Sequence, residues 1–345
     1  AYMATLSDIA EKLGITKGTV SKALNDAPDI SETMRKTILE TAVEMGYTLK
    51  RQKKNEFKKL CIFIENMDYN VPNDFGYEIV LGFKKAAEPA GYQVDLVALT
   101  PEFQKTHPYD IYMLQNGYMG AYVMGLALAD PWMAQFSHTR YPTVLYDNYV
   151  KDNLCTAYVG LDNYEGLELL ISHLKGLGHQ KIGLLSGALG SHITQARYKA
   201  FHNAMRKNHL KIDSDLVRCS YYITECTSQH LPHLLNHGAT AIVCSHDMLA
   251  NAVLTACRDF GYRIPEDLSI VGFDDLPLSA YTFPPLTTIR QDREALGKCG
   301  YFALNSLLEK VPVGTLLLHA QLILRSSTGK APSQPVQPAS PLPML

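Results

Sequence analysis

The residues near the start of the chain with the clearest chemistry are two lysines, a glycine and a serine. Lys17, Gly18, Ser21 and Lys22 fall on one face at helical spacing. A lysine can donate to the O6 and N7 acceptors of guanine, and a glycine lets the backbone come close to base edges. Near the N-terminus of a short helix, this combination predicts a surface that reads DNA in the major groove.

A second set of polar and aromatic residues lies mainly beside short apolar runs that we predict to be strands. In open α/β sheets, ligands bind beyond the carboxyl ends of the strands. Carboxylates accept from neighbouring hydroxyls, an arginine bridges two oxygens, and an aromatic ring stacks on a sugar face. These residue types predict a site for a polyhydroxylated small molecule. The candidate contacts are Phe75, Tyr77, Tyr146, Asp147, Arg197, His246, Asp247 and Asp274, and Glu65, Asn66, Asn148, Ser186 and Asp275 occupy similar positions.

Structural roles compete for some of these candidates. Asp247 suits the cap of the helix that follows it as well as it suits ligand contact. For Asp275 we favour a cap or turn over ligand contact, and His246 fits either role.

Three patterns that suggest other chemistry are set aside. Three histidines one helical turn after a cysteine resemble a metal-binding face, but a polar helix face explains them more simply. Residues 245–247 (Ser-His-Asp) are neighbours at a strand end, so their side chains point apart and form no triad. Residues 186–190 lack the lysine of a phosphate loop. We predict no catalytic residue, no metal site and no cofactor. The histidine pattern comprises Cys226, His230, His233 and His237.

The DNA-reading surface requires a small helical domain, and residues 1–47 contain patterns for three helices. Thr5 opens a capping box, and Gly14 ends the first helix. Thr16 caps the second helix, which carries the reading residues, and a third runs over residues 31–44. Their apolar faces predict one small core.

A basic linker, residues 48–59, follows this domain. Residues 1–60 hold 11 of the 32 basic residues but 8 of the 34 acidic ones, and much of the excess lies in the linker. A run of charge is usually only a solvated connection. Directly after a DNA reader, it favours neutralisation of phosphates, so we assign backbone contact to Lys53 and Lys54.

From residue 60 onward, short apolar runs alternate with amphipathic segments, which predicts an α/β body with parallel sheets. The predicted strands are 60–64, 94–98, 121–124, 144–146, 158–161, 182–185, 241–244 and 268–272. The predicted helices are 77–90, 164–175, 195–207 and 249–260. Because the pattern occurs twice, we expect two doubly wound lobes.

Three motifs in the first domain resemble the signature of the LacI/GalR (lactose-repressor) family of bacterial transcription regulators. They are residues 6–10 (LSDIA), residues 19–25 (TVSKALN) and the pair Gly46-Tyr47. The resemblance extends to about Gly329. It implies a periplasmic-binding-protein-like body with a ligand cleft between its lobes, and a homodimer on a two-fold symmetric operator. It also implies base reading by Lys17, Gly18 and Lys22, and effector binding by Asp147, Arg197 and Asp274.

The resemblance also organises the domains. We expect a helix-turn-helix head at 1–47, the linker at 48–59, an effector-sensing and dimerisation domain at 60–329, and a disordered proline-rich tail at 330–345. The first lobe is expected to span 60–160 plus 290–308, and the second 161–288 plus 309–329. The DNA contacts that we assign are Thr5, Thr16, Lys17, Gly18, Thr19, Ser21, Lys22, Asn25, Lys53 and Lys54.

The linker departs from the family pattern. After Tyr47 there is no proline and no alanine-rich turn, the features that precede the family's minor-groove wedge. Leu49 and Phe57 are apolar side chains of the wedging type, but we assign neither of them to this role. Our hypothesis is that the linker binds the DNA backbone mainly through electrostatic attraction.

Composition limits the remaining classes. A chain of 345 residues predicts two or three domains. It has no apolar run near the roughly 18 residues of a membrane helix and no export signal, so we expect a cytoplasmic protein without membrane contact. Seven scattered cysteines without a C-x-x-C pair predict reduced thiols. The tail lacks a leucine heptad, which favours a dimer over a tetramer.

Together these patterns predict a DNA-binding transcription regulator, a repressor, that is controlled by a sugar or sugar derivative. Ligand binding would change the angle between the lobes and thereby the spacing of two DNA heads. A nucleobase or nucleoside is the alternative effector. A sugar-processing enzyme with a DNA-binding head is a less favoured alternative, and turnover of the bound sugar would distinguish it.

Overall fold

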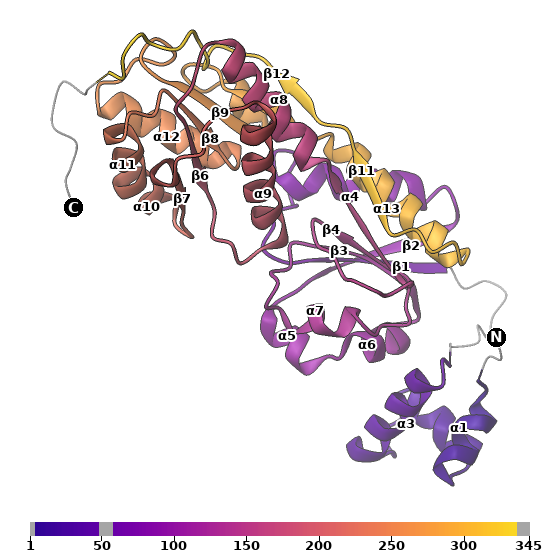
Figure 1. The fold of residues 1–345 in the computed structure, drawn as a ribbon. Coiled ribbons are helices and arrows are strands. Elements are labelled where there is room, and N and C mark those ends of the chain that lie inside the picture. The colour runs from indigo at the N-terminus through magenta and orange to yellow at the C-terminus, as the bar shows by residue number, and fades with distance from the viewer. Residues whose placement is uncertain (1–3, 48–57, 337–345) are drawn as a thin grey trace. The chain divides into compact units, whose positions relative to one another are not determined.

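The computed structural model describes residues 4–47 and 58–336 (Figure 1). Within these ranges the chain forms a three-helix head and a body of two compact units, each built on a six-stranded sheet. Lys53 and Lys54, which we assign to DNA contact, lie outside the described residues. Among the described residues, no helix combines the length and apolar character needed to span a membrane.

The head consists of α1 (Leu6–Leu13), α2 (Lys17–Leu24) and α3 (Glu32–Glu44). Each helix begins after a hydroxyl side chain that accepts a hydrogen bond from a backbone amide three residues later. Gly14 ends α1 in the left-handed conformation, with φ of 65°. The caps are Thr5, Thr16 and Ser31, and the buried core comprises Ile9, Ala10, Val20, Ala23, Leu24, Ile38, Leu39, Ala42 and Tyr47.

The first unit of the body groups the chain up to Met67 with Ile79–Val159 and Gly297–Leu316. The strand order of its sheet is β2-β1-β3-β4-β5-β11, and β1 to β5 pair in parallel. The strands are β1 (Lys58–Ile64), β2 (Tyr92–Ala98), β3 (Tyr118–Met124), β4 (Thr143–Tyr146), β5 (Thr156–Leu161) and β11 (Thr315–Leu318).

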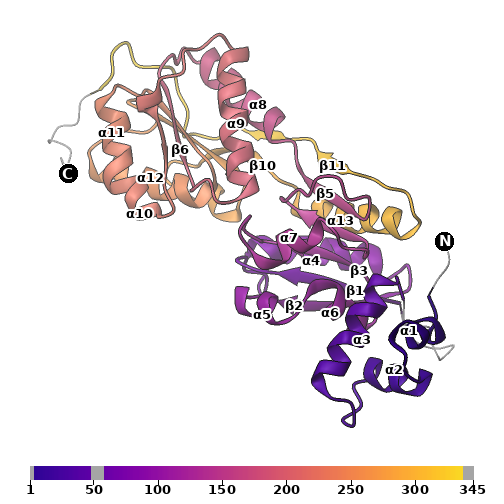
Figure 2. The same cartoon turned by 60° about the horizontal axis from the view of Figure 1, so that its bottom comes forward.

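Helices cover both faces of this first sheet (Figures 1 and 2). On one face, the ring of Trp132 lies edge-on to Phe63 of β1, with centroids 5.0 Å apart. On the other, a Cβ at Gly297 would lie 2.0 Å from the carbonyl oxygen of Ile79, so these two helices pack at backbone distance. The first face carries α5 (Pro101–Thr106), α6 (Tyr109–Asn116) and α7 (Pro131–Phe136), and the second carries α4 (Phe75–Ala87) and α13 (Arg293–Leu308).

The second unit groups Asp68–Glu78 with Gly160–Leu296 and the chain from Leu317 onward. Its strand order is β12-β10-β9-β8-β6-β7, in which β12 alone runs antiparallel to its neighbour among the described strands. The strands are β6 (Ile182–Ser186), β7 (Val217–Cys219), β8 (Ala241–Cys244), β9 (Ser269–Asp274), β10 (Thr287–Arg290) and β12 (Gln321–Ile323).

Side chains alternate across the second sheet and so build two cores. From β8, Ala241 and Val243 join the core beneath one pair of helices, while Ile242 and Cys244 join the core on the opposite face. The first pair is α8 (Asn163–Gly176) and α9 (His192–Lys207), and the second is α11 (Leu231–Asn236) and α12 (Asp247–Asp259) (Figure 2). Shorter turns are η1 (Ser214–Leu216), α10 (Ile223–Glu225), η2 (Cys226–His230) and η3 (Pro277–Ala280).

The eight predicted strands are all present, and β7, β10, β11 and β12 occur in addition. The structure divides the body differently from the predicted boundaries in three places. Residues 309–316 belong to the first unit, because the chain enters β11 beside β5 and Gly314 accepts a hydrogen bond from Tyr158. Residues 68–78 and 290–296, both predicted in the first lobe, belong to the second unit.

The prediction of disorder from Lys330 onward is wrong for residues 330–336. The Ala331 amide donates to the carbonyl oxygen of Leu177 at 2.9 Å, and the Tyr262 hydroxyl donates to that of Val336 at 3.1 Å. Proline removes a backbone donor but not the carbonyl acceptors of its neighbours, so a proline-rich segment can still be held against a folded surface. Residues 337–345 lie outside the described part of the chain.

Candidate functional site

Helix α2 carries most of the described residues to which we assign DNA contact. Lys17, Gly18 and Lys22 are exposed and Ser21 is half-buried, while the opposite face is buried in the head core. The first turn of α2 contains no acidic residue, so Lys17 adds its charge to the positive end of the helix dipole. Backbone amides and a cation at one helix terminus form a surface that favours anions and base acceptors.

Gly18 has no packing reason to be a glycine. A Cβ at this position would meet only Thr16 Oγ1 at 3.6 Å, an ordinary contact. Glycine inside a helix costs roughly 1 kcal/mol relative to alanine. Because the head does not need this glycine, its cost is consistent with a requirement imposed from outside, such as the close approach of DNA.

The other assigned side chains of the head make local hydrogen bonds. Thr16 Oγ1 accepts from the Thr19 amide at 3.1 Å and lies 2.9 Å from the Thr19 hydroxyl. Thr5 Oγ1 caps α1, and Asn25 Nδ2 donates to the Ser21 carbonyl oxygen at 2.8 Å. These bonds position the ends of α1 and α2.

Lys22 forms an ion pair with Asp29 across the loop after α2. The hydrogen bond from Lys22 lowers the pKa of the Asp29 carboxyl below its usual value. Both side chains are largely exposed, so the pair is screened by solvent and adds little to stability. Lys22 can therefore exchange this carboxylate for another acceptor at low cost.

A buried polar cluster lies at the carboxyl ends of β8 and β9 in the second unit, around Arg197. Arg197 Nε donates to Asn163 Oδ1 at 3.1 Å, Nη1 donates to the Ser245 carbonyl oxygen, and Nη2 donates to Asp274 Oδ1 at 3.0 Å. The guanidinium also lies 3.9 Å from the ring centroid of Phe273. Arg197 is thus held in a fixed orientation by four neighbours.

Asp274 ends β9 with φ of 118°, a backbone conformation that side chains rarely adopt. Its Oδ1 accepts from Arg197 and also from Gln291 Nε2 at 2.6 Å. Arg293 Nη1 lies 3.4 Å from the Asp274 carbonyl oxygen. These contacts hold the carboxylate at the strand end despite the strained backbone.

His246 caps α12, a role that the sequence suggested for Asp247. Its Nδ1 accepts a hydrogen bond from the Leu249 amide at 3.2 Å. Burial lowers the pKa of His246 below its usual value, which favours the neutral ring. With Nδ1 as an acceptor, the neutral ring carries its proton on Nε2 and offers one donor.

Asp247 is fully buried and serves the fold. Oδ2 accepts from the Leu276 amide at 2.9 Å and from the Ser279 hydroxyl at 2.6 Å, and Oδ1 accepts from the Thr288 hydroxyl at 2.6 Å. Burial raises the pKa of Asp247 to about 7, and the neighbouring Asp274 adds to the shift. The expected alternative, a cap on the following helix, is wrong, because His246 is the cap.

The aromatic candidates from the start of α4 also belong to the second unit. Arg293 lies 5.8 Å from the Phe75 ring centroid, and its Nε donates to Glu78 at 2.7 Å. Tyr77 is half-buried beside them in sequence. Arg293 therefore contacts the backbone of Asp274 and the start of α4 within one unit.

Tyr146 and Asp147 stand at the end of β4 in the first unit. Tyr146 is only 2% exposed, which leaves little ring surface for stacking. Asp147 has φ of 54°, and its amide donates to the Val159 carbonyl oxygen at 3.1 Å. In the same unit, burial raises the pKa of Glu65 to about 6, and Gln104 donates to its carboxylate.

Three members of the polar cluster were not predicted. Asn163 follows β5 by two residues, the position rule that found the other candidates, so the signal was available. Gln291 and Arg293 follow β10, a strand that was not predicted. Asp275, for which we favour a cap or a turn, forms ion pairs with Arg290 and Arg325 at 2.7 and 2.6 Å.

Comparison with known proteins agrees with this architecture. Residues 5–49 match the family model for bacterial regulatory proteins of the lacI family, and residues 171–328 match a periplasmic binding protein-like domain. The transcriptional regulator reg1 of Streptomyces lividans is 29% identical, over 96% of this chain and 99% of its own. The transcriptional repressor CytR of Escherichia coli is 27% identical, over 95% and 97%.

A solved structure extends the likeness to nearly the whole chain. The Lac repressor dimer bound to operator and the anti-inducer ONPF has a TM-score of 0.65 and 25% sequence identity, covering 95% of this chain and 100% of that one. The exposed reading helix, the doubly wound sheets and these relatives lead to one assignment. The chain is a DNA-binding transcription regulator and belongs to the LacI family.

Proposed function

We propose that this regulator binds a two-fold symmetric operator as a homodimer and represses transcription until a small molecule changes its affinity for DNA. The proposal that the protein binds DNA rests on the exposed face of α2, where no packing contact within the head requires Gly18 to be a glycine. Lys17 and Lys22 on that face supply donors for guanine. The Lac repressor solved as a dimer on its operator supports the same arrangement.

The effector site that we propose is the polar cluster of Arg197, His246 and Asp274. A guanidinium has five N–H groups, and three of those on Arg197 donate to described residues. His246 adds an Nε2–H donor, and both hydrogen bonds that described residues donate to the Asp274 carboxylate go to Oδ1. The remaining donors and the second carboxylate oxygen suit the hydroxyl groups of a sugar or sugar derivative.

The other candidates enter this proposal with different roles. Phe75, Tyr77 and Asp147 remain proposed contacts of the effector. For Asp247, the internal hydrogen bonds favour a positioning role, in which it fixes the turn after β9 behind the cluster. For Tyr146, burial favours a core role. We also propose that the bound molecule is released unchanged, so that the protein is not an enzyme.

Selection of operator DNA from a random duplex pool tests the first half of the proposal. The selected sites are expected to be inverted repeats, bound by two chains, and DNA affinity is expected to fall when Lys17 is replaced by Ala. A selected site without two-fold symmetry, or binding that ignores sequence, would contradict the proposed operator mode.

A ligand screen on the selected operator tests the second half. Sugars and sugar derivatives are added one at a time, with nucleobases and nucleosides as the alternative class, and the change in operator affinity is measured. An effector must bind the two states of the regulator differently, so binding without a change in DNA affinity does not qualify. Mass analysis of the recovered ligand then distinguishes a sensor, which returns it intact, from an enzyme.

A further inference from the structure

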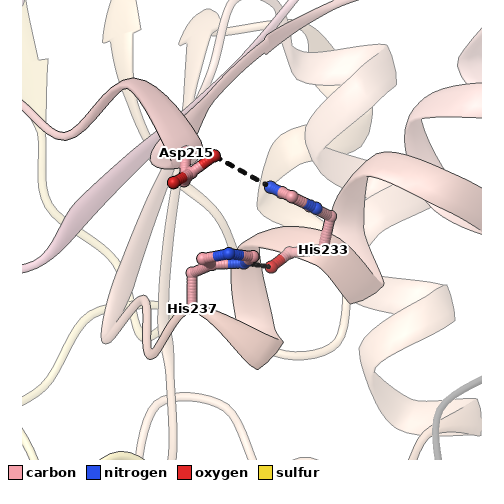
Figure 3. Close-up of side chains that lie close together, drawn as sticks. All are labelled: Asp215, His233 and His237. Carbon is pink, nitrogen blue, oxygen red and sulfur yellow. Dashed lines mark hydrogen bonds and ion pairs between the residues drawn. The ribbon is translucent and has the colours of Figure 1, made fainter.

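A cluster of side chains on the surface of the second unit has the composition of a metal site. Asp215 lies on η1, His233 lies on α11, and His237 directly follows α11 (Figure 3). One ligand atom from each of the three residues lies within 4.8 Å of the others. Asp215 and His237 are exposed and His233 is half-buried, so the three groups are open to solvent.

The helix positions the two imidazoles on one face. Residues four apart on a helix are neighbours, and the ring centroids of His233 and His237 are 4.1 Å apart in a stacked arrangement. The Asp215 carboxylate lies on the His233 side of this pair, with Oδ1 3.7 Å from His233 Nε2 (Figure 3). These three groups come from segments that are separate in sequence and adjacent in the fold.

The hydrogen bonds leave both imidazoles with a lone pair on Nε2. His237 Nδ1 lies 2.8 Å from the His233 carbonyl oxygen, which can only accept, so in a neutral ring the proton is on Nδ1. Arg218 Nη2 donates to His233 Nε2, so this nitrogen also presents its lone pair. A backbone carbonyl that holds the far ring nitrogen is a common support for a metal-bound histidine.

Two imidazole nitrogens and one carboxylate form the ligand set of zinc and related divalent ions, whereas magnesium and calcium prefer oxygen alone. In a tetrahedral zinc site such ligand atoms lie about 3.4 Å apart, close to the separation of Asp215 and His233.

We propose that Asp215, His233 and His237 bind a divalent transition-metal ion of the zinc type, with a fourth position open to water. The sequence pattern around Cys226 and His230 does not form this site, because Cys226 is buried with its sulfur directed at the Ser186 carbonyl oxygen. The aspartate that completes the set is contributed from η1 and was not considered in the sequence pattern.

Arg218 is the competitor of the metal. Its Nη2 contacts His233 and lies 3.3 Å from Asp215 Oδ1, so a cation already occupies the space between two of the ligands. Arg218 Nη1 donates to the Ser214 and Val217 carbonyl oxygens at 2.8 Å, and these bonds can persist when Nη2 moves away. The bound ion would join η1 to α11 beside β7, the edge strand of the sheet.

The test uses the full-length protein and titrates it with Zn²⁺ by calorimetry and with Co²⁺ by visible absorption. One ion per chain is expected, with ligand-field bands of a tetrahedral Co²⁺ site. Replacement of either ligand histidine, His233→Gln or His237→Gln, should weaken binding by at least about tenfold. His230→Gln is the matched control, because His230 is adjacent in sequence but outside the cluster, and it should leave affinity unchanged.

Two further measurements make the proposal specific to this site. Affinity should fall in acidic solution, because a protonated imidazole cannot bind a metal. Arg218→Ala should tighten Zn²⁺ binding by removing the competing cation. The proposal is overturned if the wild-type chain binds no Zn²⁺, if His233→Gln and His237→Gln bind as the wild type does, or if Arg218→Ala weakens binding.

Discussion

Arg197 and Asp274 form a buried ion pair across the second unit, with Nη2 of one 3.0 Å from Oδ1 of the other. Arg197 comes from α9 and Asp274 from the end of β9, 77 residues later. Burial of either charge alone would cost free energy, whereas in the pair each charge offsets the desolvation of the other. The same two side chains are therefore part of the fold and part of the proposed effector site.

This dual role predicts different results for two substitutions of Arg197. Arg197→Ala leaves Asp274 buried without its cation and should lower the free energy of unfolding by about 3 kcal/mol. Arg197→Lys keeps the charge but loses the planar fork, so it should cost less stability and still abolish the effector response. Denaturant unfolding and operator binding with and without effector measure both effects. An intact response in Arg197→Lys would remove Arg197 from the effector site.

Gly18→Ala should increase the stability of the head and weaken its binding to operator DNA. Since a Cβ fits at Gly18, the substitution should raise the free energy of unfolding of the head by about 0.5 to 1 kcal/mol. The same methyl group should obstruct DNA and cost about 1 to 3 kcal/mol of specific operator binding. Ser7→Ala, at an exposed position of α1, serves as the matched control. Wild-type operator affinity in Gly18→Ala would show that the glycine is not needed for DNA approach.

Asp247 should give the second unit a characteristic dependence on pH. Its pKa is raised to about 7 in the folded state from an ordinary value of 3.8, so the folded chain retains a proton that the unfolded chain releases. Between about pH 4 and 7 this group therefore reduces stability as pH rises, and above pH 7 its effect is constant. Asp247→Asn should remove this slope, as measured by denaturant unfolding from pH 4.5 to 8. An unchanged slope in the variant would assign the pH dependence to other groups.

The linker lysines should contribute affinity without sequence preference. Replacing both Lys53 and Lys54 with Ala removes two cations next to the head, which should weaken binding to all duplexes about equally and reduce the slope of affinity against salt by about two. Binding to the selected operator and to random DNA is measured over a range of salt concentrations. A loss confined to the operator would mean that the linker reads sequence.

The strands that the sequence predicts are mainly apolar and buried, whereas β10, a buried strand with polar residues, was missed. The eight predicted strands consist mainly of apolar residues. In β10, by contrast, Thr287 and Thr288 are fully buried, because their hydroxyl groups bond to Arg325 and Asp247 inside the second unit. A buried threonine satisfied by a distant partner has the same sequence pattern as an exposed one, so β10 was not predicted.

Prediction of the polar cluster was limited in the same way, by which strands the sequence reveals. Arg197 and Asp274 were found because they follow strands that the sequence reveals, and Gln291 was missed because it follows β10. The proposed metal site was missed for a different reason. Two histidines at helical spacing are visible in sequence, but the approach of Asp215 depends on how β7 and η1 lie against α11, which only the tertiary fold determines.

The close packing of α13 on α4 joins two helices that are far apart in sequence, and this has a consequence while the chain is being synthesised. The three helices of the head are contiguous in sequence and leave the ribosome before the body does. The first unit is incomplete until Gly297 and its helix, which follow late in the sequence, pack against Ile79. A nascent chain thus carries a complete DNA-reading head long before it has a closed sensor, and interrupted translation would release a reader without its control.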